Sequence, residues 1–175
     1  MQLHRVLIVV LGAVMVAGCN LERRDALPGG AGVDVASTQE TLLPIGESLK
    51  VRVNRDRDVL GLPALVASQA LDEAARLRAE DMLIRGYLGA IGPGDTSVAA
   101  QDLMAVAGYS GRLGELIYEH VGPLSSLTES TVGAWMASDI HRKLLLDTRF
   151  QFLGAGLAGG SDAWIVVMLF AEVGP

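Results

Sequence analysis

The stretch FQFLGAGLAGGSDAWIVVMLF, residues 150–170, decides the fold class of this chain. It holds two apolar runs, residues 150–158 and 162–170, rich in the aliphatic and aromatic residues that favour strands. The glycines and serine at 159–161, which separate the runs, are typical of a turn. The stretch therefore predicts an antiparallel hairpin whose loop is longer than two residues.

Upstream of the hairpin, residues 113–121 form another apolar run and predict a strand. Ser126, with Glu129 three residues later, matches a capping box and predicts a helix that continues through Trp135. Helices come first along the chain and strands follow around a late helix, so the pattern indicates the α+β class.

Apolar residues at helical spacing predict a first helix over residues 42–60, which Gly61 ends. Asn54 and Arg57 are interpreted as a solvated or locally paired face of this helix. Two further helices are expected. One follows the N-cap Ser68 and ends at Gly86, and the other is capped by Thr96 or Ser97 and runs to about Ala107.

The first residues, MQLHRVLIVVLGAVMVAGC, have the order of a secretory signal. Arg5 supplies the positive charge, residues 6–17 are apolar, and the small Ala17 and Gly18 precede Cys19. The apolar run is shorter than the roughly 20 residues that span a bilayer, so a cleaved signal is favoured over a transmembrane helix.

The tetrapeptide Val16-Ala17-Gly18-Cys19 resembles the lipobox of bacterial lipoproteins. The resemblance implies that residues 1–18 are removed and that Cys19, the only cysteine, carries lipid that anchors the chain to a membrane. The alternative is an ordinary signal followed by a chance cysteine. By resemblance to lipoproteins of bacteria with two membranes, Asn20 after the cysteine favours transfer to the outer membrane. The protein is then expected on the periplasmic face of that membrane, in the cell envelope.

The region after the anchor divides into a spacer and a domain. Residues 19–40 are expected to form the lipidated N-terminus and a flexible spacer, and residues 41–175 a single domain. Arg5 is the only charged residue in the leader, so the mature chain keeps 13 of 14 basic residues and all 20 acidic ones, a net charge of −7. Such a charge argues against nucleic acid as a partner.

Several motifs occur in a fixed order from about residue 49 to 171, and together they resemble the bacterial CAP domain, also called the SCP or allergen-like domain. They are Asn54-x-x-Arg57 with Gly61-Leu62, Ala79-x-Asp81-Met82, Gly108-Tyr109, Gly114-Glu115, Trp135-x-x-Ser138-x-x-His141-Arg142, and Gly154-x-Gly156. The resemblance implies an α-β-α sandwich in which helices flank a central antiparallel sheet.

In that family the resemblance also implies a cleft where histidines and glutamates gather a divalent cation. Glu115 and His141 match the family's cleft positions, and Trp135 and Ser138 belong to the same motif. Ala90 stands where a further histidine is usual. Two ligands are fewer than the three that catalytic zinc normally has, so Glu115 and His141 are only weak zinc candidates and no cofactor is expected.

Other polar residues have simpler interpretations. Glu115 would be costly to bury without a partner, so a hydrogen bond to His141 is expected. His120 follows Glu115 by an odd number of residues, which places it on the opposite face of a regular strand. Trp135 and Tyr109 are interpreted as core or cleft-wall residues.

Three functions remain open. The first is a non-enzymatic, membrane-anchored binding module for a lipid, a glycan or an envelope protein. The second is a metal-dependent hydrolase that uses Glu115 and His141, although the chain offers no evident nucleophile. The third is a purely structural envelope lipoprotein.

Overall fold

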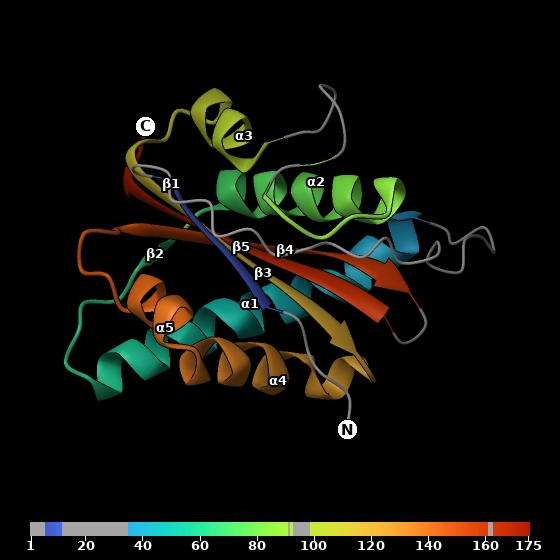
Figure 1. The fold of residues 1–175 in the computed structure, drawn as a ribbon, viewed down its shortest axis with the longest axis horizontal. Helices are drawn as coiled ribbons and strands as arrows, with labels where there is room; N and C mark the ends of the chain where they lie inside the picture. Colours follow the sequence, from blue (N-terminus) through green and yellow to red (C-terminus); the bar gives the residue numbers. More distant parts are fainter. Residues whose placement is uncertain (1–5, 12–34, 91, 93–98, 161–162) are drawn as a thin grey trace.

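The computed structural model describes residues 6–11, 35–90, 92, 99–160 and 163–175. Within these residues, a sheet lies between two layers of helices (Figure 1). Its strand order is β1-β3-β5-β4-β2. The strands are β1 (Val6–Leu11), β2 (Val66–Ala67), β3 (Ser110–Val121), β4 (Phe152–Gly160) and β5 (Ala163–Val173).

Helices cover both faces of this sheet, which confirms the expected α-β-α sandwich (Figure 1). One face carries α2 (Gln69–Arg85) and α3 (Ala100–Val106). The other carries α1 (Val35–Val59), α4 (Leu124–Ala137) and α5 (Asp139–Leu145). Successive side chains of a strand point to opposite faces, so β5 supplies Val167 and Leu169 to the core under α2, and Met168 and Phe170 to the core over α1.

The predicted hairpin is confirmed as the antiparallel pair β4 and β5. Gly159 and Gly160, expected in the loop, belong to β4 and pair with Trp164 and Ala163. The connection is therefore shorter than predicted, because these glycines continue the strand. The sheet also contains one parallel pair that the sequence did not predict, between the short β2 and β4.

Residues of the expected leader lie at one edge of the sheet. The backbone of β1 pairs antiparallel with β3, from Val6 opposite Tyr118 to Leu11 opposite Leu113. Cys19 and the residues around it lie outside the described part of the chain. Among the described helices, none is both long and apolar enough to cross a membrane.

In the N-terminal half of the domain, one helix start differs from the predictions and one agrees with them. The helix α1 begins at Val35, so the expected spacer of residues 19–40 is wrong for residues 35–40. Residues 35–40 contain no glycine or proline, so nothing in them stops a helix. They were predicted as spacer because they show no apolar period. By contrast, α2 begins after Ser68, whose Oγ accepts from the Leu71 amide, and ends at Gly86 in the left-handed conformation, as predicted.

The predicted caps of the next two helices are wrong. The N-cap of α3 is Ala99, whereas Thr96 and Ser97 lie outside the described residues. The helix α4 begins after Pro123, so Ser126 lies inside its first turn and donates to the Pro123 carbonyl. Glu129 forms an ion pair with Arg52 of α1 in place of a capping bond.

The interpretation of Asn54 and Arg57 as a solvated face is also wrong for Arg57, which is fully buried. Its guanidinium donates to the carbonyls of Pro63 and Leu145 at 3.0 and 2.7 Å. Asn54 bonds both the amide and the carbonyl of Leu65 at 2.9 Å. These side chains join α1 to the segments that precede β2 and β4.

The helix α2 lies against β4 at two glycines. A Cβ atom built on Gly154 would lie 2.4 Å from the backbone carbon of Leu71, and one on Gly156 would lie 2.1 Å from the Arg76 nitrogen. Any side chain at these positions would push α2 off the sheet. The spacing Gly154-x-Gly156 therefore has a direct steric cause, and it determines how closely α2 approaches β4.

Replacing Gly156 by alanine is expected to lower the free energy of unfolding by about 3 kcal/mol, because the added methyl group displaces the α2 backbone. Chemical denaturation of the full chain measures this change. The matched control is Gly160→Ala on the same strand, where a Cβ meets no atom within 4 Å. Equal effects of the two substitutions would contradict the steric role of Gly156.

Candidate functional site

Glu115 lies in the middle of β3 and points toward α2. It shares this face with Ile117, which belongs to the core under α2. The residue is only 2% exposed. Its Oε1 accepts a hydrogen bond from Nε of Arg78 at 2.9 Å, so a cationic side chain of α2 neutralises the buried carboxylate.

The other guanidinium nitrogens of Arg78 are bonded as well. Nη1 donates to the Tyr87 hydroxyl and lies 3.7 Å from Oδ2 of Asp81, and Nη2 donates to the Gly89 carbonyl. The guanidinium also lies 5.5 Å from the centre of the Tyr87 ring. The Tyr87 hydroxyl donates in turn to Asp81. We call these five residues, Arg78, Asp81, Tyr87, Gly89 and Glu115, the Arg78 network.

Sequence reasoning missed Arg78, although a signal was present. Arg78 follows Leu71 by seven residues and precedes Met82 by four, so it falls on the apolar stripe of α2. A charged residue at such a position is buried and needs a partner. Glu115, an acid within an apolar strand, is the complementary signal.

His141 lies on the other side of the sheet from the Glu115 side chain. Its helix, α5, packs through Leu144 and Leu145 into the core over α1. His141 is 5% exposed. The expected hydrogen bond between Glu115 and His141 is not formed, because the two side chains lie on opposite faces of the sheet and the Glu115 carboxylate bonds Arg78.

The remaining predicted cleft residues lie on the His141 side. Trp135 is fully buried in α4, and its ring meets that of Tyr118 edge to face at 6.4 Å. Ser138 is the half-buried junction at which α4 ends and α5 begins. Its carbonyl accepts from the Arg142 amide at 2.8 Å. The structure thus groups Trp135, Ser138 and His141 in one layer and leaves Glu115 facing the other.

His120 lies on the face opposite to Glu115, as the odd separation predicted. It stacks at a tilt beside Tyr118, whose side chain belongs to the core over α1. Its Nε2 lies 3.1 Å from the carbonyl of Pro123 and 3.4 Å from Oγ of Ser126. His120 therefore helps to fix the start of α4.

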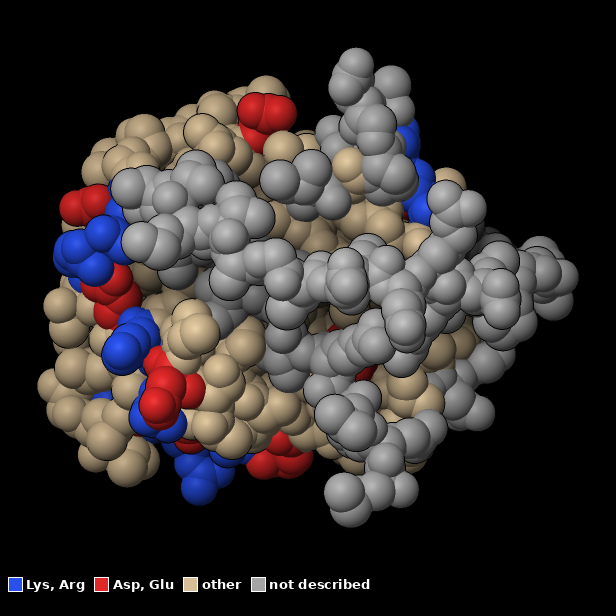
Figure 2. All heavy atoms as spheres, viewed as in Figure 1, with Lys and Arg blue, Asp and Glu red and all other residues tan. Residues whose placement is uncertain are grey.

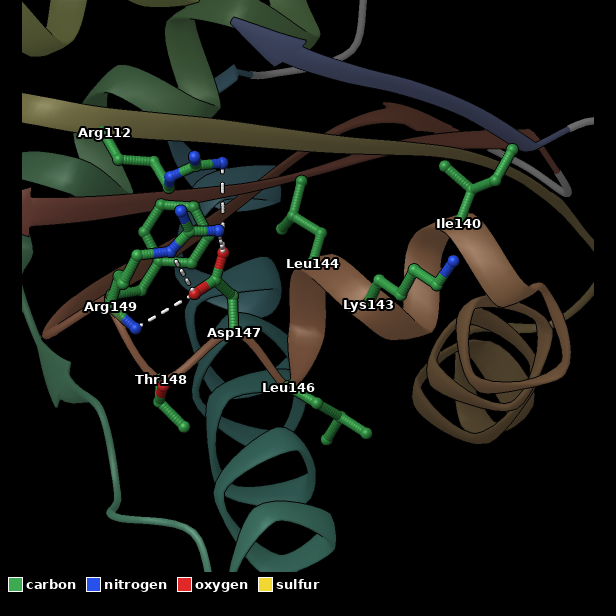
Figure 3. Close-up of a pocket in the computed structure, with 9 residues that line it drawn as sticks. Arg112, Ile140, Lys143, Leu144, Leu146, Asp147, Thr148 and Arg149 are labelled. Carbon is green, nitrogen blue, oxygen red and sulfur yellow. Dashed lines mark hydrogen bonds and ion pairs between the residues drawn. The ribbon is translucent and has the colours of Figure 1, made fainter. Parts of the chain in front are cut away.

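A cavity of about 830 Å³ opens between α5, the start of β3 and the segment before β4 (Figure 3). Arg112, Lys143 and Arg149 line it, and Asp147 is its acidic residue. Oδ2 of Asp147 lies 2.7 Å from Nη2 of Arg149 and 3.9 Å from Nη1 of Arg112 (Figure 3). Contact with Arg149 lowers the pKa of Asp147. We call this cavity the basic pocket.

Charges on the face drawn in Figure 2 are mixed in sign. Figure 2 shows basic and acidic side chains interleaved along one side of the molecule. Opposite charges at this spacing largely cancel at a distance. A local excess of one sign, as in the basic pocket, is therefore more informative than the overall charge.

The fold and these motifs define a class of protein, a three-layer sandwich built on a mainly antiparallel sheet. Residues 51–170 match the CAP family, described as the Cysteine-rich secretory protein family. The chain belongs to this family.

One curated relative matches a large part of the chain. The uncharacterized protein YkwD of Bacillus subtilis is 29% identical over 111 residues, which cover 63% of this chain and 41% of YkwD. The chain therefore spans less than half the length of that relative.

Solved structures support the fold. An extracellular SCP-domain protein of Bacillus anthracis superposes with a TM-score of 0.65 at 20% identity, over 82% of this chain and 45% of that one. An outer surface protein of Borrelia burgdorferi superposes with a TM-score of 0.62 at 17% identity, over 75% of this chain and 94% of that one.

The residues of this chain do not fit the divalent cation of the family cleft. The Glu115 carboxylate already bonds a guanidinium, and a second cation beside Arg78 would be repelled. Ala90, next to Gly89 of the Arg78 network, offers no ligand atom in its side chain. Among the described residues no three His, Cys, Asp or Glu side chains come together as a metal site.

Burial raises the pKa of Glu115 to about 7, whereas the contact with Arg78 acts in the opposite direction. The pKa in the folded chain therefore exceeds the ordinary value of 4.5. Between these two values the folded state binds more protons than the unfolded state. The stability contributed by this group is present below about pH 4.5 and is lost as the pH rises through about 7.

We expect the free energy of unfolding to fall by about 3 kcal/mol from this group as the pH rises through that window. Glu115→Gln should remove this slope, because glutamine does not titrate. Urea denaturation of both proteins at a series of pH values measures the difference. Glu119→Gln on the same strand, at a half-buried residue, serves as the control, and a slope kept in Glu115→Gln would refute the assignment.

Proposed function

We propose that the chain is an exported, lipid-anchored protein of the cell envelope whose CAP domain acts as a non-enzymatic binding module. Its ligand class is a lipid, a glycan or an envelope protein. The observation that carries the proposal is the bond between Arg78 and Glu115, which engages the one cleft carboxylate that the family pattern supplies. Binding then depends on surfaces outside the Arg78 network.

The hydrolase alternative needs a base or a metal-bound water within reach of a substrate. Glu115 is buried and bonded to Arg78, and His141 lies across the sheet from its side chain. These positions argue against the pair as a joint catalytic unit. A purely structural lipoprotein is the third candidate, and a specific ligand would exclude it.

Location is the other half of the proposal. The sequence Val16-Ala17-Gly18-Cys19 supports lipidation of Cys19 and removal of residues 1–18. Several acyl chains at about 0.8 kcal/mol per buried methylene would hold the protein on its membrane. Asn20 supports the periplasmic face of the outer membrane. The extracellular and outer-surface relatives agree with export in general.

Growth of expressing bacteria with an alkyne-labelled fatty acid should label the wild-type protein and leave Cys19→Ala unlabelled, because Cys19 is the only thiol. Intact-mass spectrometry should show loss of residues 1–18 in the wild type alone. Cys19→Ser serves as a second variant of nearly equal size. Label that persists in both variants would contradict lipidation at Cys19.

Calorimetric titration of the purified full chain with Zn²⁺ should give no saturable heat, because the donor set is incomplete. Stoichiometric binding that His141→Ala abolishes and His120→Ala preserves would support the hydrolase alternative. Loss of binding in both variants would indicate a site unrelated to the family cleft, and would leave the binding-module proposal standing.

A further inference from the structure

The outer edge of β3 is the feature that the proposed function leaves unused. β3 has β5 on one side, and on the other its residues Leu113–Tyr118 pair with β1. This inference rests on the proposed function, in which residues 1–18, and β1 with them, are removed. The mature chain would then have an unpaired backbone edge on β3. Such an edge is a ready template for another strand.

The edge is bordered by protein rather than freely exposed. Residues 113–118 are all buried in the full chain, and α5 contacts β1. A strand in the place of β1 therefore gains backbone bonds to β3 and lies against α5. The six residues in that place, VLIVVL, are all apolar, and they run antiparallel to β3.

The edge leads to the basic pocket at one end. Leu11 is opposite Leu113, so a strand continued past this position comes next to Arg112, which lines the pocket. The exposed Lys143 also lines the pocket and has no ion pair with any described residue. The pocket carries three basic residues and one acidic residue in a chain of net charge −6. It therefore favours a negative group.

We propose that in the mature protein the outer edge of β3 binds an extended strand of a different polypeptide. This partner strand is apolar, runs antiparallel to β3, and ends in an acidic side chain or a C-terminal carboxylate that enters the basic pocket. Backbone bonds give affinity in this mode of recognition, and the pocket gives direction and selectivity. The site thereby specifies the proposed ligand as a polypeptide.

The test uses mature protein extracted from membranes in detergent, with loss of residues 1–18 verified by mass spectrometry. The probe is a fluorescent peptide with the sequence VLIVVL, preceded by lysines for solubility and followed by two aspartates. Fluorescence anisotropy should show saturable binding. Full chain with Cys19→Ala, which keeps β1, should bind at least about tenfold more weakly, because its own strand competes as a ligand tethered to the edge.

Matched peptides and variants separate the two parts of the site. Methylation of those alternate backbone nitrogens of the peptide that face β3 should weaken binding by about tenfold, because each lost donor removes a hydrogen bond to the strand. Lys143→Glu should weaken binding of the aspartate peptide and strengthen that of a lysine-tailed one. Arg55→Glu, at an exposed residue of α1, should change neither.

Three outcomes would overturn the proposal: no binding by verified mature protein, equal binding of the methylated peptide, or a mature dimer in sedimentation that the peptide dissociates. The last would assign the edge to a second copy of the chain. If mass spectrometry shows that the leader is retained, the proposed function fails separately. The edge is then tested on the full chain with Ile8→Pro, which removes a backbone donor from β1.

Discussion

The close approach of α2 to β4 is the constraint on which the rest of the structure depends. At Gly154 and Gly156 the helix backbone lies where a Cβ atom would otherwise be. A helix held at this depth presents its inward side chains to the neighbouring strands as well, and Arg78 thereby reaches Glu115 on β3. The glycines and the ion pair are thus consequences of one packing distance, although they lie far apart in the sequence.

Burial of the ion pair explains why the family cleft takes a different form in this chain. A carboxylate at 2% exposure needs a counter-charge, and either a metal ion or a basic side chain can supply it. Arg78 supplies it from within the protein, and its remaining nitrogens bond Tyr87 and the Gly89 carbonyl. The guanidinium therefore fixes the end of α2 and the following segment without a cation from solution. The Glu115 carboxylate is then bonded to Arg78 and is not free to bind a metal ion.

Much of the fold could be predicted from local signals, and the failures have physical causes. The hairpin of β4 and β5 and the caps Ser68 and Gly86 follow from short-range patterns, and all are present. The role of Arg57 depends on a contact with a residue distant in the sequence, which periodicity does not report. The start of α1 at Val35 falls where the sequence has no apolar period to mark it. For the site, the family pattern identified Glu115, but the partner expected for it, His141, lies across the sheet. The actual partner, Arg78, was marked only by a charge on the apolar stripe of α2.

The outer edge of β3 pairs with residues of the expected leader, and the same edge is the proposed binding site of the mature domain. The residues of β1 form part of the apolar run expected to direct export, and in the folded full chain their backbone is paired into the sheet. A segment paired with β3 is not free to enter a translocation channel, so export and folding compete for the same residues. Under the proposed export, folding is completed after residues 1–18 have left the chain. In that proposal another molecule supplies the strand partner of β3, and a lipid anchor at Cys19 would limit the partner to polypeptides of one membrane surface.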